Sequence, residues 1–271
     1  RVPRGWGRSG KCPAGTGHGF FMPETAGTLA VIPARYGSRR LPAKVLAPIA
    51  GRSMLEHVWH RTGQAQTVER VVVATDDDRV REAALVFAAP ADVVMTGPNH
   101  ACGTDRIAEV ARTVPAGLYV NVQSDMPLLD PALIDATVAA LEADPELGMA
   151  TAAVPIADGE LANPDVVKVT IGADGHALGF FRQYPDDQDT VYHHVGIYAF
   201  RRQTLLRFVE LGPSPLEHTE GLEQLRALEN GIAIGVALLD ISGHLSVDSS
   251  KELEAARTAF EAGKLSGQVE G

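Results

Sequence analysis

The sequence predicts an α/β fold, a doubly wound and mostly parallel sheet with a smaller antiparallel insertion. From residue 28 onward, short apolar runs alternate with segments of helical periodicity, which is typical of parallel strands connected by helices. Over residues 165–201 this pattern gives way to two strands joined by an Ala-Asp-Gly turn and a further strand of alternating character, which indicates the antiparallel insertion. The predicted buried strands before it are residues 28–34, 70–75, 91–96, 118–123 and 148–156.

One domain is predicted over residues 28–265, with the insertion at about 165–200. Residues 1–27 are rich in Gly, Arg and Pro and show no apolar period, so we expect a disordered tail. A single helix is expected over residues 214–231, because Leu residues recur at helical spacing between an early Pro and the terminal Gly231. Further helices are expected near residues 53–66 and from about Lys251.

Composition and charge exclude several classes of protein. The chain has 271 residues and a mass of 28.7 kDa, with a formal net charge of −10 and a pI of about 5.4. This acidity repels nucleic acid and anionic membranes, and no apolar run approaches the roughly 18 residues of a spanning helix, so we expect neither partner. The two cysteines, Cys12 and Cys102, lack metal-ligand spacing and are too few for a disulfide framework, which favours a cytoplasmic protein.

A basic loop follows the first predicted strand. Backbone N–H groups and clustered cations bind polyphosphate, and ligands of open α/β sheets lie at the carboxyl ends of strands. The loop matches neither the P-loop nor the G-x-G-x-x-G pattern, and a solvated basic loop is the alternative interpretation. Its position after a strand favours phosphate binding. Residues 33–44 combine Gly37 and Ser38 with four cations, Arg35, Arg39, Arg40 and Lys44.

Six segments, taken in order, resemble the CMP-Kdo synthetases (3-deoxy-manno-octulosonate cytidylyltransferases), a family of sugar nucleotidyltransferases that use CTP. The resemblance implies a Rossmann-like nucleotidyltransferase fold and a Mg²⁺-dependent enzyme that transfers CMP from CTP to a small acidic acceptor and releases pyrophosphate. It also implies a homodimer. The segments are VIPARYGSRRLPAKVL (31–46), NHACGTDRIAE (99–109), NVQSDMP (121–127), HHVGIYAFR (193–201), SPLEHTEGLEQLR (214–226) and SVDSSKELEAAR (246–257).

The resemblance implies catalytic roles for four residues. Asp125 and Asp248 fall on the two positions where the family holds Mg²⁺. Each follows an apolar strand, so two carboxylates from distant segments can converge on one hard cation. The alternative interpretation of each is a helix cap. Lys44 and Arg35 complete the predicted catalytic set by binding the phosphates of CTP.

The remaining predicted site residues divide between the nucleotide and the acceptor. Asp105 and Arg106 are equally well explained as a helix cap and a salt bridge. The alternative interpretation of His194 is a strand residue that bonds a backbone carbonyl. The guanidinium of Arg182 can hold a carboxylate in a bidentate way. Residues implied to bind the nucleotide are Ala34, Arg35, Ser38, Arg40, Lys44, His100, Asp105 and Arg106. Residues implied to bind the acceptor are Gln123, Arg182, His194, Glu217 and His218.

Acceptor-side residues depart from the family pattern. Ser124 and Met126 stand where the strand-end motif usually has Gly and Glu, and His218 stands where the family has Gln. Because the metal and nucleotide residues are kept, we expect CTP chemistry with either Kdo or another small acid. One alternative is a CTP-dependent phosphonoformate or phosphonate cytidylyltransferase of a natural-product pathway. A second is a catalytically silent nucleotide-binding protein, which the presence of both aspartates disfavours.

Overall fold

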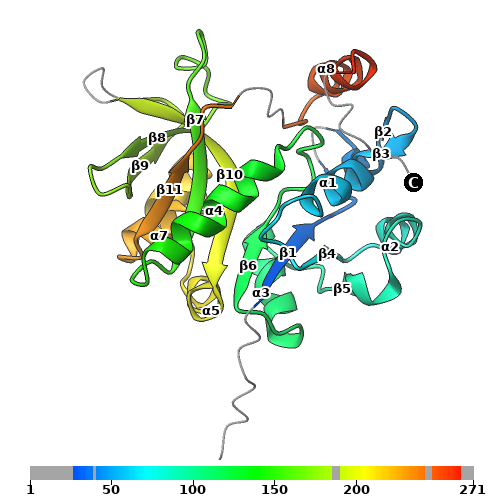
Figure 1. The fold of residues 1–271 in the computed structure, drawn as a ribbon, viewed down its shortest axis with the longest axis horizontal. Helices are drawn as coiled ribbons and strands as arrows, with labels where there is room; N and C mark the ends of the chain where they lie inside the picture. Colours follow the sequence, from blue (N-terminus) through cyan, green and yellow to red (C-terminus); the bar gives the residue numbers. More distant parts are fainter. Residues whose placement is uncertain (1–26, 39–40, 185–189, 242–245, 264–271) are drawn as a thin grey trace, which may run out of the picture.

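The computed structural model describes residues 27–38, 41–184, 190–241 and 246–263 (Figure 1). Residues 1–26 of the predicted tail and the predicted phosphate ligand Arg40 therefore lie outside the described residues.

The described chain alternates strands and helices. None of the helices among these residues is long and apolar enough to cross a membrane. The strands are β1 (Thr28–Pro33), β2 (Pro48–Ile49), β3 (Arg52–Ser53), β4 (Arg70–Thr75), β5 (Val93–Met95), β6 (Leu118–Asn121), β7 (Met149–Pro155), β8 (Lys168–Ile171), β9 (Ala177–Phe181), β10 (Val191–Arg201) and β11 (Ile234–Leu238). The helices are α1 (Met54–Thr62), α2 (Asp78–Ala84), α3 (Gly103–Thr113), α4 (Pro131–Ala143), α5 (Arg202–Glu210), α6 (Pro215–Glu220), α7 (Leu225–Glu229) and α8 (Ser250–Glu261), with short 3-10 helices η1 (Lys44–Leu46) and η2 (Pro90–Asp92).

The predicted α/β fold class is confirmed. The main sheet has the strand order β11-β7-β10-β6-β1-β4-β5. β1 pairs in parallel with β4 and β6, β4 with β5, and β7 with β11, whereas β10 runs antiparallel between β6 and β7. The carboxyl ends of β1, β4 and β6 therefore meet at one edge of the sheet, which is where ligands of such folds bind.

Helices cover both faces of the sheet because the central strands are apolar on both sides. Along β1, Ala30 and Ile32 are buried in the core that α1 and α4 complete, while Leu29 and Val31 are buried with α3 and α5. Figure 1 shows α4 crossing the face of β7 and β10. Alternate residues of one strand thus serve two separate cores, which is the doubly wound arrangement.

The antiparallel segment consists of β8, β9 and the first part of β10. β8 pairs antiparallel with β9 and with Val191–His193 of β10. After a register shift between Val195 and Tyr198, β10 continues as a central strand of the main sheet. One long strand therefore joins the antiparallel hairpin to the parallel core, and its irregularity includes Gly196.

The single helix expected over residues 214–231 is wrong. The segment forms two short helices, α6 and α7, because Gly221 ends α6 with a left-handed backbone of φ +64°. The periodic leucines do not share one face: Leu216 is 49% exposed, whereas Leu222 and Leu225 are buried. The break lets Leu222 and Leu225 join the core shared with α3 and α5.

A small third core attaches the last helix to the segment after β1. Val247 and Leu253 pack with Ile49 and Met54, so α8 lies against the β2–β3 hairpin and the start of α1. The backbone N–H of Val247 donates to the carbonyl oxygen of Asp125 at 2.8 Å. These contacts hold the segment before α8 beside the loop that follows β6.

Candidate active site

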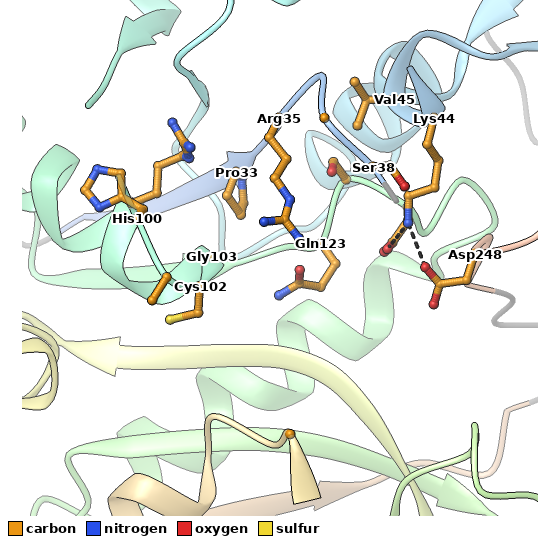
Figure 2. A pocket seen from close by; sticks show the side chains of 16 residues that line it. Pro33, Arg35, Ser38, Lys44, Val45, His100, Cys102, Gly103, Gln123 and Asp248 are labelled. Carbon is orange, nitrogen blue, oxygen red and sulfur yellow. Dashed lines mark hydrogen bonds and ion pairs between the residues drawn. The ribbon is translucent and has the colours of Figure 1, made fainter. Parts of the chain in front are cut away.

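Lys44 lies between the two carboxylates that the sequence predicts as metal ligands. Its Nζ donates to Asp125 Oδ2 at 2.7 Å and to Asp248 Oδ1 at 2.9 Å (Figure 2). Lys44 begins η1 directly after Ala43, whose φ of +54° is left-handed. Asp125 follows β6, and Asp248 precedes α8. Three distant segments of the chain therefore converge on one charged group.

The helix-cap interpretation fails for both carboxylates. Asp130 caps α4 by accepting from the backbone N–H of Ala132, and Ser249 caps α8 by accepting from that of Glu252. Asp125 and Asp248 instead direct carboxylate oxygens at Lys44. Their side chains are thus available for a role at this junction.

Burial and charge oppose each other at Lys44. The residue is 8% exposed, and its burial disfavours the ammonium form. The charges and hydrogen bonds of Asp125 and Asp248 outweigh burial and raise the pKa of Lys44 above its ordinary value. Lys44 is therefore a cation at neutral pH.

A cavity of about 810 Å³ opens beside this junction, at the carboxyl ends of β1 and β6. Its size is that of a small-molecule site. Figure 2 shows Lys44 and Asp248 at one end of it and His100 and Cys102 at the other. The predicted nucleotide-binding residues that line it are Arg35, Ser38, Lys44, His100 and Arg106.

The basic loop presents its residues to this cavity in different ways. Arg35 is exposed and lines the cavity. Ala34 is fully buried, and its N–H donates to the carbonyl of Ala74 at 2.8 Å, so that N–H is not available to a base. Ser38 lines the cavity, and its Oγ accepts from the N–H of Leu41 at 3.4 Å.

Asp105 and Arg106 are neighbours in α3 but have different surroundings. Arg106 is 5% exposed, lines the cavity, and has Nη2 3.1 Å from a carboxylate oxygen of Asp76. Asp105 lies outside the cavity lining and accepts from the N–H groups of Ala101 and Cys102 at 3.1 and 3.3 Å. Asp105 therefore completes the capping box of α3, whose N-cap residue is Cys102, whereas Arg106 is a fixed part of the cavity wall.

A second cavity, of about 560 Å³, adjoins the first. It lies along β10, the loop before β8 and the chain that follows α6. Gln123, Asp125, Gly221 and Asp248 line both cavities. The two carboxylates therefore stand where two chambers meet, so a ligand in each chamber would approach the other at this point.

Three predicted acceptor residues, Gln123, Arg182 and His194, line the second cavity. Arg182 is tied to the main chain: its Nε donates to the carbonyl of Glu220 at 2.7 Å and its Nη1 to that of Pro164 at 3.2 Å. These bonds occupy part of the guanidinium, which limits the bidentate grip that the sequence predicts.

His194 is a neutral residue of the cavity wall. It is 6% exposed, its Nε2 is 2.9 Å from the hydroxyl of Thr151, and its ring packs edge-on against Phe180. Burial lowers the pKa of His194 to about 3. The partner of Nε2 is thus the Thr151 hydroxyl and not the backbone carbonyl of the alternative interpretation. The neutral imidazole brings no charge to an acidic ligand.

Glu217 and His218 lie outside the linings of both cavities. Glu217 receives two hydrogen bonds from the guanidinium of Arg226, at 2.5 and 2.8 Å, and one from the N–H of Ser214. His218 is exposed, with Nδ1 3.2 Å from the carbonyl of Ser214. The Ser214–Glu217 capping box explains why these residues sit on α6 and away from the acceptor chamber.

Two residues of the second cavity escaped the sequence-based prediction. Glu223 Oε2 and Gln224 Nε2 are buried and have no hydrogen-bond partner among the described residues. Burial raises the pKa of the Glu223 carboxyl. Polar atoms in this condition call for a ligand or water. In the sequence, the polar pair Glu223-Gln224 shortly after Gly221 was the feature that could have indicated these cavity residues. Its burial, however, depends on the break between α6 and α7.

The paired carboxylates fit a hard divalent cation. Asp125 and Asp248 present oxygen atoms, which Mg²⁺ prefers, to a common position now met by the Lys44 ammonium. Within the described ranges, no group of three or more His, Cys, Asp or Glu side chains is placed to hold a metal. A cation here would take two protein carboxylates and complete its shell with phosphate and water, as Mg²⁺ usually does in phosphate-transfer sites.

The fold and this double chamber are those of a nucleotidyltransferase, and sequence comparison defines the class more narrowly. The profile of the cytidylyltransferase family matches residues 29–234. The chain therefore belongs to the cytidylyltransferase family.

Relatives within this family carry a more particular name. The chain is 44% identical over 247 residues to a 3-deoxy-manno-octulosonate cytidylyltransferase of Myxococcus xanthus, covering 88% of this chain and 98% of that protein. It is 45% identical over 256 residues to one of Pseudomonas syringae, covering 88% and 100%. A solved structure of a CMP:2-keto-3-deoxy-manno-octonic acid synthetase in complex with CTP superimposes with a TM-score of 0.82 at 40% identity, covering 89% and 100%. The resemblance to the CMP-Kdo synthetases is confirmed.

A fall in pH should destabilise the protein through His194. The folded state keeps the imidazole neutral down to a pKa of about 3, whereas the unfolded chain takes up a proton near pH 6.5. The unfolded state binds more protons between these values, so the free energy of unfolding should fall with pH, by up to about 1.4 kcal/mol per unit below 6.5. The free energy of unfolding, measured with urea at several pH values between 7 and 5, should therefore fall less steeply with pH for His194→Gln than for the wild type. Equal slopes would contradict the neutral, buried assignment.

Proposed function

We propose that the protein transfers CMP from CTP to the sugar acid 3-deoxy-manno-octulosonate (Kdo) and releases pyrophosphate. One observation carries the proposal: Asp125 and Asp248 meet Lys44 where the two cavities join. The names of the relatives, which include a structure with CTP, supply the two substrates. Because CTP is a cytoplasmic metabolite, we also propose a cytoplasmic location.

The nucleotide belongs in the cavity that the basic loop lines. Arg35 and Lys44 supply positive charge to the triphosphate, which this acidic chain would otherwise repel. Ser38, His100 and Arg106 line the same chamber and are our candidates for contacts with the ribose and cytosine. Since the N–H of Ala34 is already bonded, we leave Ala34 out of these contacts.

The acceptor belongs in the second cavity. Arg182 and Gln123 offer donors to a carboxylate, and the neutral His194 offers a single hydrogen bond. The unpaired Glu223 Oε2 and Gln224 Nε2 favour a ligand with several hydroxyl groups. A polyhydroxy acid such as Kdo satisfies them, and none of the relatives described above is named for a phosphonate, so nothing supports the phosphonate alternative.

The chemistry is an in-line displacement at phosphorus. An oxygen of the acceptor forms a bond to the α-phosphorus of CTP, the bond from that phosphorus to the bridging oxygen breaks, and pyrophosphate leaves. The acceptor hydroxyl loses its proton to solvent. Arg35 and Lys44 stabilise the charge on the departing pyrophosphate, while the walls of the two chambers bring both substrates to the junction.

Mg²⁺ is the metal that the two carboxylates would hold. Asp125 and Asp248 would bind it, and the bound ion would lower the pKa of the attacking hydroxyl and offset phosphate charge. The proposal is supported by the oxygen-only donor pair at the junction and by their common contact with a cation.

Pyrophosphate release from CTP tests the proposed function. The assay contains Mg²⁺ with Kdo, sialic acid, phosphonoformate or no acceptor, and replaces CTP by UTP or ATP in control reactions. We expect release that depends on both CTP and Kdo. Binding of CTP without release in the presence of any acceptor would instead favour the silent binder.

Asp125→Asn tests the junction. Replacing the carboxylate by an amide should lower kcat about 10³-fold or more, because the cation loses a charged ligand. The fold should be kept, with a lower melting temperature, because the buried Lys44 loses one of its two charged partners. Asp130→Asn is the matched control: Asp130 caps α4, Asn caps helices equally well, and its activity should stay near that of the wild type. Near-wild-type turnover by Asp125→Asn would make the metal assignment wrong.

We further propose a homodimer that forms through the antiparallel segment. Leu178 of β9 is 67% exposed and Leu238 of β11 is 48% exposed, and both line one groove. Light scattering should give a mass of twice 28.7 kDa for the wild type and of one chain for Leu178→Glu. Val86→Glu, at a residue 82% exposed beyond α2, is the control and should remain dimeric. A dimeric Leu178→Glu would place the interface elsewhere.

A further inference from the structure

Lys168 is a second buried lysine, and the proposed reaction gives it no role. It is the first residue of β8 and is 0% exposed. In the sheet it stands opposite Phe181 of β9 and His193 of β10. Those two residues directly precede Arg182 and His194 of the acceptor cavity, so Lys168 lies immediately behind the wall of that cavity.

The ammonium of Lys168 bonds two separate parts of this wall. Its Nζ donates to the carbonyl oxygen of Arg182, at the end of β9, at 2.8 Å, and to that of Asn163, in the loop before β8, at 2.5 Å. Arg182 and Asn163 both line the acceptor cavity. Arg182 in turn donates from Nη1 to the carbonyl of Pro164, so the loop and the strand end are held together at two points.

Space filling alone does not explain a charged group at this position. Burying an ammonium disfavours folding unless its hydrogen bonds are satisfied, and an apolar side chain would fill the same volume without that penalty. Burial lowers the pKa of Lys168, the charge of Glu160 opposes this effect, and the charge of Arg182 adds to it. The two carbonyl bonds are therefore what the ammonium contributes.

We propose that Lys168 is a positioning residue for the acceptor. Its hydrogen bonds fix the loop containing Asn163 against the end of β9 and so hold the Arg182 side chain at the cavity. Neither Lys168 nor its two partners line the nucleotide cavity, so the effect is confined to the acceptor. This inference rests on the proposed function.

Lys168→Met tests the proposal, because it keeps the length of the side chain and removes the ammonium. The KM for Kdo should rise about tenfold, as expected for the loss of a hydrogen bond from a charged group, with a smaller change in kcat. The Kd for CTP, measured by calorimetry without acceptor, should stay within about twofold of the wild type. Lys168→Arg keeps the charge and several donors and should recover most of the KM. If Lys168→Met does not fold, Lys168→Gln replaces it: this variant loses the charge but keeps a donor, and its KM for Kdo and Kd for CTP are compared with those of the wild type in the same way.

Leu141→Ala is the control for simple loss of stability. Leu141 is fully buried in α4 and lies outside both cavity linings. Leu141→Ala should lower the melting temperature without raising the KM for Kdo relative to the Kd for CTP. An unchanged KM for Kdo in Lys168→Met, an equal rise in the KM for Kdo and the Kd for CTP, or the same separation in Leu141→Ala would overturn the inference alone. Failure of the wild type to use Kdo would overturn the proposed function, and the inference with it.

Discussion

The site depends on one interaction, the contact of a buried ammonium with two carboxylates. Lys44 meets Asp125 at 2.7 Å and Asp248 at 2.9 Å, and each partner comes from a different part of the chain. Removing either carboxylate would leave buried charge poorly compensated, so the three groups require one another. The two carboxylates line both cavities, and Lys44 lines the first, which gives this electrostatic centre its place in the proposed transfer of CMP.

The architecture serves to assemble this centre. Parallel β1 and β6 deliver the Lys44 loop and Asp125 to the same sheet edge, and the small core around Ile49 and Val247 holds the segment with Asp248 against that edge. β10 runs antiparallel through the sheet and provides the floor of the acceptor chamber at His194. Lys44, Asp125 and Asp248 thus come together only when the sheet and the small core pack.

The sequence predicted the parts of this account that rest on short-range signals. Apolar periodicity predicted the strand series, and the cations after the first strand predicted a phosphate-binding loop that includes Lys44. The residues alone left Asp125 and Asp248 open between metal ligand and helix cap, and the family resemblance implied the metal role. The sequence patterns did not predict which side chains are buried or which distant segments pack together. The Leu spacing over residues 214–231 suggested one helix, whereas Gly221 breaks it, which leaves Glu217 in a capping box and brings Glu223 into the acceptor cavity. The family resemblance likewise gave no warning that main-chain carbonyls occupy part of the Arg182 guanidinium.

The central claim is that Asp125 and Asp248 act together at a single point, and a double-mutant cycle tests it most directly. The measurement is kcat/KM for CTP and Kdo in Asp125→Asn, Asp248→Asn and the double variant, each checked for an unchanged fold. Groups that act as a unit lose most of their effect with the first substitution. The account therefore predicts that the double variant is about as impaired as the worse single variant. Losses that multiply in the double variant would show that the two carboxylates act independently and would contradict it.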